Sequence, residues 1–157
     1  MQYFDTVLMP VQMPDISNRR INGFGHQPGT SVYLAGAEGA LYRSVDDGRT
    51  WSAVIEEPAG TSSYPYIPLL TFWSRFPDVG LAAGFNKSDM QPFLAILSGG
   101  GARWTDVSSL LGNIENGMVT DLTEDPHGRM LAGCSMTTPN GDHRRGAAAC
   151  GMGRSTC

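Results

Sequence analysis

The chain has 157 residues, of which 41% are hydrophobic and 17% charged, and its formal net charge is −4. This length fits one domain with a modest core, and the few scattered basic residues argue against a nucleic-acid interface, which needs clustered Lys and Arg. No apolar run approaches the length of a membrane span. The N-terminus has no basic first segment and gives no clear signal peptide, so we expect a cytoplasmic protein by default.

The predicted elements are short strands, because 20 glycines and 10 prolines favour turns over long helices. In chain order, "FDTVLMPV" is a candidate extra strand that pairs with a neighbouring unit. "SVYLAGAEGALYRS" predicts a strand, a glycine turn and a strand, and "DVGLAAGFNKSDMQPFLAILSGGGARW" repeats that plan with a longer connection. "MVTDLTEDPHGRMLAGCSM" begins the plan a third time, and the tail after it loses the alternation.

Three five-residue segments of similar sequence can be stacked as internal repeats. They are "VYLAG" (32–36), "GLAAG" (80–84) and "RMLAG" (129–133). Their final glycines are 48 and 49 residues apart, and Trp51 and Trp104 are 53 apart. A period near 50 residues with about four strands per unit is typical of a β-propeller blade. We therefore expect an all-β fold, a partial β-propeller of antiparallel four-stranded blades.

The repeats predict how the chain is divided. We expect an N-terminal strand or arm over 1–19, two propeller blades over 20–117, and an incomplete third blade with an irregular tail over 118–157. A propeller that does not close leaves sheet edges and apolar flanks without a neighbour. We therefore expect self-association or a longer parent chain.

One turn segment, "SVDDGRTW", carries the most specific pattern in the sequence. It fits S-x-D-x-G-x-T-W at Ser44, Asp46, Gly48, Thr50 and Trp51. This pattern resembles the Asp-box, or BNR repeat, of sialidases and of many other propellers, and the resemblance implies a β-propeller. A second copy, "SGGGARW" (98–104), is degenerate: it is one residue shorter and lacks both the Asp and the Thr.

The residue types of this pattern suit a structural role. An Asp in a tight hairpin can accept hydrogen bonds from backbone N–H groups just after it, and Gly48 allows a positive φ. The hydroxyls of Ser44 and Thr50 can bridge the two strand ends. Trp51 can bury a large apolar ring between blades. We therefore expect the five residues to stabilise the fold, and we assign no catalytic residue.

Residues for catalysis are harder to place. The resemblance to sialidases implies an arginine cluster, a Tyr/Glu pair and an acid/base Asp, and here only Arg75 and Arg103 are candidates for the cluster. Glycoside hydrolysis needs two carboxylates across a cleft. Glu56 and Glu57 are adjacent and point to opposite faces of a strand. A fragment of a sialidase-like or other propeller glycoside hydrolase stays open as the alternative function.

The aromatic segment "YPYIPLLTFW" (64–73) is the main candidate for a surface that binds carbohydrate or protein. The candidate binding residues are Tyr64, Tyr66, Trp73, Arg75 and Arg103. In the favoured alternative, Trp73 packs in the core of the second blade and the Tyr-Pro pairs stiffen the linker.

The leading hypothesis for function is a non-catalytic Asp-box β-propeller module that acts as a binding or assembly scaffold. We expect no cofactor and no metal, because Cys134, His143, Cys150 and Cys157 contain no paired C-x2-C spacing. A truncated or frameshifted chain without activity of its own is a third hypothesis, suggested by the tail.

Overall fold

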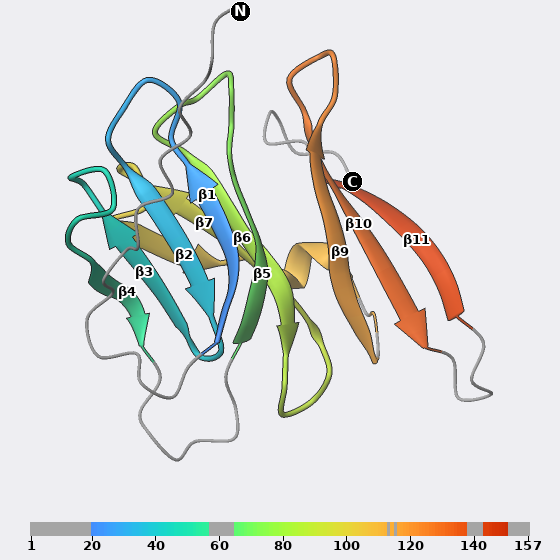
Figure 1. Cartoon of the computed structure of the whole chain (residues 1–157). Helices are drawn as coiled ribbons and strands as arrows, with labels where there is room; N and C mark the ends of the chain where they lie inside the picture. Colours follow the sequence, from blue (N-terminus) through green and yellow to red (C-terminus); the bar gives the residue numbers. More distant parts are fainter. Residues whose placement is uncertain (1–19, 57–64, 113, 115, 138–142, 151–157) are drawn as a thin grey trace, which may run out of the picture.

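The computed structural model describes residues 20–56, 65–112, 114, 116–137 and 143–150. Strands make up most of this part of the chain, and they form three antiparallel sheets (Figure 1). The predicted all-β class with four-stranded antiparallel units is therefore confirmed. The segment "FDTVLMPV" and Tyr64 lie outside the described residues.

Each sheet is a meander in which strands that follow one another in sequence pair side by side. The first sheet contains β1 (Ile21–His26), β2 (Tyr33–Ala37), β3 (Ala40–Ser44) and β4 (Ser52–Glu56). The second contains β5 (Pro65–Phe72), β6 (Gly80–Asn86), β7 (Pro92–Ser98) and β8 (Arg103–Asp106). A 3-10 helix, η1 (Ser108–Leu111), leads to the third sheet, which contains β9 (Gly117–Glu124), β10 (Met130–Thr137) and β11 (His143–Cys150). The tail that we expected to be irregular thus contains a strand, β11.

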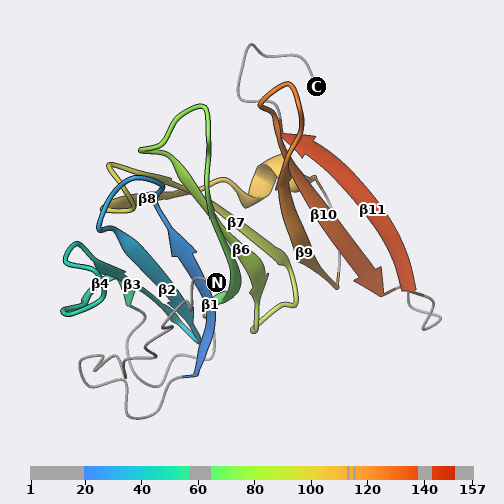
Figure 2. The same ribbon diagram turned by 45° about the horizontal axis from the view of Figure 1, so that its top comes forward.

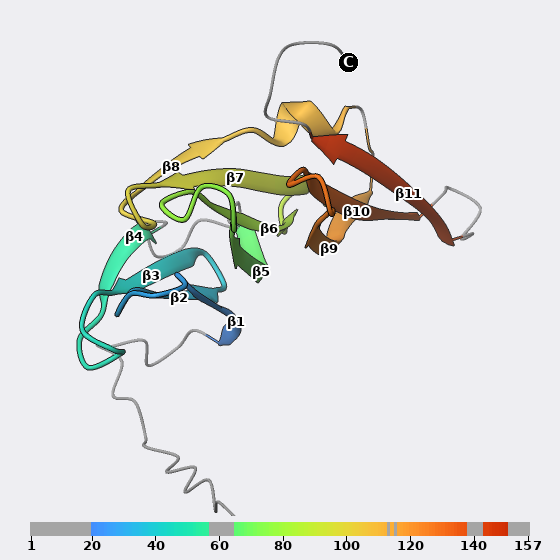
Figure 3. The ribbon, with the colours of Figure 1, turned by 90° about the horizontal axis from the view of Figure 1, so that it is seen from above.

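The three sheets follow one another like successive blades. β1 lies beside β5, and β9 packs against β6, β7 and β5. β11 is the strand furthest from the second sheet (Figure 2). Seen from above, the described sheets do not close into a ring (Figure 3). This is the arrangement of a partial propeller.

The hydrophobic core is divided between the two seams where neighbouring sheets pack. The first seam contains Leu34, Leu41, Ile55, Ile67, Phe72, Ala82, Phe93, Ala95 and Leu97. The second seam contains Trp73, Leu81, Ala83, Leu94, Leu111, Val119, Met130, Ala132 and Cys134. A further cluster, on the face of the first sheet away from the second, contains Ala35, Ala37, Ala40, Tyr42 and Trp51.

The faces of the strands fix how the repeats superpose, because successive residues of a strand point to opposite faces. We call a side chain forward when it points toward the next sheet along the chain, and backward when it points to the opposite face of its sheet. The cluster of Ala35, Ala37, Ala40, Tyr42 and Trp51 is the backward cluster of the first sheet. Leu34 points forward into the first seam, and Leu81 points forward into the second. Ala132 points backward into the second seam, so Leu131 beside it points forward. Leu34, Leu81 and Leu131 are therefore equivalent.

This register corrects the alignment drawn from the sequence. Gly36 lies on the forward face of its sheet. Gly84 lies on the backward face of the second sheet, because it shares a face with Ala82, which packs in the first seam. Aligning Gly36 with Gly84 would therefore match residues on opposite faces. The residue of the second sheet equivalent to Gly36 is Ala83. Stacking Gly36 on Gly133 keeps both residues forward and agrees with the structure. The second repeat was therefore placed one residue out of phase.

Candidate functional site

A closed hydrogen-bond network holds the turn between β3 and β4, where the most specific sequence pattern lies. Asp46 Oδ1 accepts hydrogen bonds from Ser44 Oγ and from Thr50 N, each at 2.8 Å. Asp46 Oδ2 accepts one from Thr50 Oγ1 at 2.7 Å. Ser44 Oγ in turn accepts one from Gly48 N at 2.9 Å. The carboxylate thus serves the turn itself.

The same contacts tune the acidity of this carboxyl group. The hydrogen bonds from the Thr50 hydroxyl and the Thr50 backbone N–H favour the charged form, and they lower the pKa of Asp46 from 3.8 to about 2. A general base or acid works best with a pKa near the operating pH. Asp46 is therefore ionised and a weak base at neutral pH, which suits a structural role better than proton transfer.

Trp51 closes the turn from the other side. Its Nε1 donates a hydrogen bond to Gly48 O at 2.9 Å, and its ring is 9% exposed. Gly48 has a φ of 80°, which a glycine adopts without strain. The ring belongs to the backward cluster of the first sheet and meets Phe24 edge-on at 6.4 Å between centroids. Trp51 is thus buried as expected, but outside the two seams of the described sheets.

The turn between β7 and β8 resembles the first turn in part of its backbone. Gly101 has a φ of 83°, and Gly100 N donates to Asp78 O at 3.1 Å as Asp47 N donates to Ser31 O at 3.2 Å. Gly100 is thus equivalent to Asp47, and it follows that Gly101 is equivalent to Gly48 and Trp104 to Trp51. The prediction that this second turn is one residue shorter is therefore wrong.

The second turn nevertheless lacks the side-chain network of the first. The residues that take the places of Ser44, Asp46 and Thr50 are Leu97, Gly99 and Arg103. None of the three offers a carboxylate or hydroxyl acceptor for backbone N–H groups. Trp104 is 40% exposed, far more than Trp51. The two turns therefore share part of their backbone path, but Gly99 has a φ of 61° where Asp46 has no positive φ, and the second turn lacks the side-chain contacts of the first.

The predicted binding residues do not gather on one surface. Trp73 is 3% exposed and packs in the second seam, where its Nε1 donates to Gly128 O at 2.8 Å. Tyr66 lies near the opposite end of β5 and packs on Phe85 at 5.1 Å between ring centroids. The guanidinium of Arg75 lies over the Phe76 ring, 5.6 Å from its centroid. Trp73 therefore cannot serve as an exposed platform.

Arg75 does line an open hollow of about 490 Å³ above the second seam. The lining residues are Ser74, Arg75, Glu124, Asp125, Pro126 and Gly128. The carboxylate of Glu124 is already bound, because it accepts hydrogen bonds from Ser74 N at 3.0 Å and Ser74 Oγ at 2.7 Å. These bonds, led by the one from the Ser74 hydroxyl, lower the pKa of Glu124. The hollow thus offers one exposed cation beside a carboxylate that joins two sheets.

Contacts between loops of successive sheets were not foreseen from the sequence. Gln27 Nε2 donates to Asp78 Oδ1 at 2.9 Å and so joins the first sheet to the second. The bonds from Trp73 and Ser74 join the second sheet to the third. The available signal was a Pro-containing turn near the start of each repeated segment, since these contacts lie in or beside those turns: "HQPGT" (26–30), "RFPDV" (75–79) and "DPHGR" (125–129).

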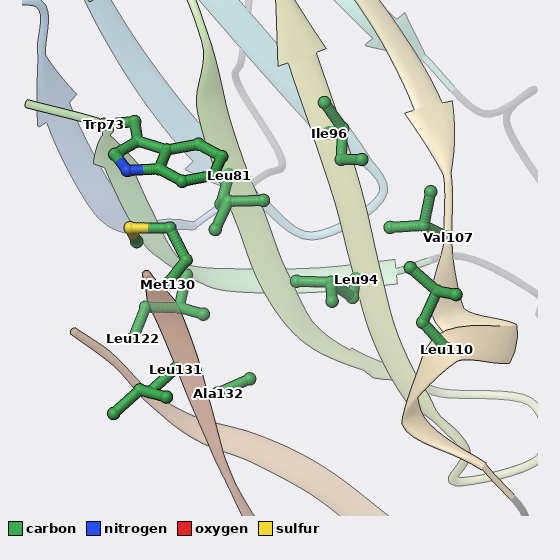
Figure 4. Close-up of a pocket in the computed structure, with 10 residues that line it drawn as sticks. All are labelled: Trp73, Leu81, Leu94, Ile96, Val107, Leu110, Leu122, Met130, Leu131 and Ala132. Carbon is green, nitrogen blue, oxygen red and sulfur yellow. The ribbon is translucent and has the colours of Figure 1, made fainter. Parts of the chain in front are cut away.

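A small apolar void lies in the second seam (Figure 4). Its volume is about 20 Å³, and its lining residues are Trp73, Leu81, Leu94, Ile96, Val107, Leu110, Leu122, Met130, Leu131 and Ala132. This volume holds about one water-sized sphere. The void is a packing defect of the seam rather than room for a ligand.

No protein-family model matches the chain, and no curated protein matches it. Within the described ranges, no three His, Cys, Asp or Glu side chains gather closely enough to hold a metal ion. The same part of the chain contains no helix long and apolar enough to cross a membrane.

Proposed function

We propose that this chain is a non-catalytic Asp-box β-propeller module that acts as a binding or assembly scaffold. The observation that carries the proposal is the use of the Asp46 carboxylate. Both of its oxygens accept hydrogen bonds within the turn, from Ser44 and Thr50. With a pKa of about 2, the group is also poorly matched to acid–base chemistry at neutral pH.

Exposed apolar side chains support an assembly role. Phe24 is 63% exposed on the first sheet, Leu110 is 53% exposed on η1, and Trp104 is 40% exposed on β8. Apolar surface of this kind, next to sheets that do not close a ring, favours contact with another protein surface. We therefore propose that the module self-associates or packs on a longer parent chain, and that its ligand is a protein or a carbohydrate.

Light scattering of the purified protein tests the assembly role. We expect the measured mass to exceed that of one chain. If the protein is a monomer, we expect it to bind a hydrophobic dye, because exposed apolar surface favours both self-association and dye binding. A monodisperse monomer with a cooperative melt and no dye binding would contradict this role.

The alternative is a fragment of a sialidase-like or other propeller glycoside hydrolase, and the open hollow beside Arg75 favours it. A clamp on a substrate carboxylate needs exposed cations, and Arg75 is one. We expect no turnover of a fluorogenic sialoside above a heat-killed control, since no nucleophile pair is assigned. Turnover that Arg75→Ala abolishes, while leaving the melting temperature unchanged, would favour the hydrolase over the scaffold.

A further inference from the structure

The first seam brings the backbones of two sheets into direct contact. A Cβ added at Gly36, in the first sheet, would collide with the backbone oxygen of Ile67 in β5. A Cβ added at Gly23 would collide with the backbone oxygen of Pro68, in the same strand. Protein interiors are close-packed, so two backbones that interlock in this way cannot move apart without losing many contacts at once. The first two sheets are therefore held firmly together.

Hydrogen bonds close this first seam at both ends. At the end where the β1–β2 and β5–β6 loops lie (Figure 1), Gln27 Nε2 donates to Asp78 Oδ1 at 2.9 Å. At the other end, Gly39 N, in the turn between β2 and β3, donates to Pro65 O at 2.9 Å. Neither end of the first seam can therefore open on its own.

The second seam is filled by side chains instead. The largest of them are Trp73, Leu81, Leu94, Val119 and Met130, and the small void lies among them (Figure 4). For each glycine that the structure describes in the second and third sheets, the three nearest neighbours of an added Cβ include no backbone atom from across this seam. The second and third sheets thus meet through side-chain surfaces, which can part without unfolding either sheet.

At the loop end, three hydrogen bonds to the turn between β9 and β10 close the second seam. Ser74 N and Ser74 Oγ donate to the Glu124 carboxylate at 3.0 and 2.7 Å. Trp73 Nε1 donates to Gly128 O at 2.8 Å. We call these three bonds the latch. Ser74 is exposed, so water can replace its two bonds when the sheets separate.

The opposite end of the second seam has the features of a hinge. The chain enters β9 at Gly117, and Gly117 N donates to Met90 O, in the turn between β6 and β7, at 2.8 Å. Met90 and Asn116, beside this bond, have positive φ values of 54° and 50°. Such values are uncommon for residues other than glycine. Hinges are a few loop or strand-end residues that absorb changes in φ and ψ, and rotation here would carry the whole third sheet.

We propose that the second seam opens as a hinge. The first two sheets move as one body, and the third sheet swings about Met90 and Asn116 when the latch breaks. Local openings of this kind expose buried groups without global unfolding. The open form exposes apolar side chains of the second seam, so the protein presents a different surface when the latch is broken. The motion depends on the contacts of this seam and not on the far face of the third sheet or on the assembly role proposed above.

The thiol of Cys134 reports the opening, because Cys134 is 2% exposed and packs in the second seam. With Cys150→Ser and Cys157→Ser it is the only thiol of the chain, and Ellman's reagent at one fixed pH measures its rate of reaction. A matched protein adds Cys134→Ala and Ala95→Cys, which moves the thiol into the first seam, where Ala95 is 0% exposed. Each rate is divided by the rate of the same protein unfolded in urea.

We expect Cys134 to react faster than the thiol at position 95. Ser74→Ala removes one donor of the latch and should speed the reaction of Cys134 by about three- to tenfold. It should change the rate at position 95 by less than about twofold, because the first seam stays closed.

Three results would overturn the proposal: equal rates at the two positions, no increase at Cys134 with Ser74→Ala, or an equal increase at both positions. The first and the last would mean that the seams open only by global unfolding. If Ala95→Cys does not melt cooperatively, Ala82→Cys places the thiol in the same seam, at a residue that is also 0% exposed.

Discussion

Trp51→Ala is expected to lower the free energy of unfolding by about 3–5 kcal/mol, the usual range for truncating a buried large aromatic residue. The Trp51 ring is 9% exposed, packs in the backward cluster of the first sheet, and bonds Gly48 O through Nε1. Truncation removes both the packing and the hydrogen bond. Urea unfolding followed by circular dichroism measures the loss.

Trp104→Ala is the matched control, because Trp104 occupies the equivalent position after the second turn. Its ring is 40% exposed, so we expect a cost of only about 1–2 kcal/mol, in proportion to the smaller area that it buries. Equal costs for the two variants would contradict the burial difference. Trp51→Phe adds a further comparison, since it keeps a large ring and deletes the donor to Gly48 O.

Gly36→Ala is expected to destabilise the protein by about 1–3 kcal/mol or more, because the added methyl group overpacks the first seam. The new Cβ would collide with the Ile67 backbone oxygen and would lie 3.1 Å from Ile67 Cγ2. A backbone oxygen within a strand cannot turn aside as a flexible side chain can, so the two sheets must separate. Urea unfolding again gives the cost.

Gly133→Ala provides the matched comparison for this substitution. It makes the same chemical change at the equivalent position of the third sheet, where the nearest atom to the new Cβ would be 3.5 Å away. We expect a change within about 0.5 kcal/mol, as for a surface substitution. A Gly133→Ala variant as unstable as Gly36→Ala would mean that another surface packs on the third sheet.

The sequence predicted the class of fold because its signals are local. Strands of four to eight residues separated by glycine turns, and a period near 50 residues, indicated repeated antiparallel sheets. The phase of the second repeat was missed because "GLAAG" is small and apolar throughout and fits either face. Only the pairing of Leu81 with Ile96 and its place in the second seam settle the register.

The contacts around the candidate site were harder to predict. The Ser44–Trp51 turn is held by bonds between residues two to four apart, so its pattern can be read directly from the sequence. The bonds from Gln27 to Asp78 and from Trp73 to Gly128 join residues 51 and 55 apart. The Pro-containing turns mark where these bonds lie, but no local pattern says which turn bonds to which. Tyr66 and Trp73 were grouped by nearness in sequence, but the extended β5 places them at opposite ends.

The melting temperature of the wild type and of Asp46→Asn as a function of pH tests most directly whether the Ser44–Trp51 turn is structural. The native pKa of Asp46 is about 2, below the value of about 3.9 for an unfolded Asp, so its ionised form stabilises the native state. That contribution is complete above about pH 5 and is lost as the pH falls through about 4 toward 2. The pKa values of Glu124 and Asp125 are also lowered, so the wild type loses stability in acid for several reasons, and the difference from Asp46→Asn isolates Asp46.

We predict that Asp46→Asn melts several degrees below the wild type at pH 7, because Asn offers one acceptor oxygen where the carboxylate offers two. The gap should narrow below about pH 4 and be nearly closed at pH 2, where about half of the native molecules carry a protonated Asp46. A variant that melts together with the wild type from pH 7 to pH 2 would contradict the account, because the carboxylate would then contribute nothing to the fold.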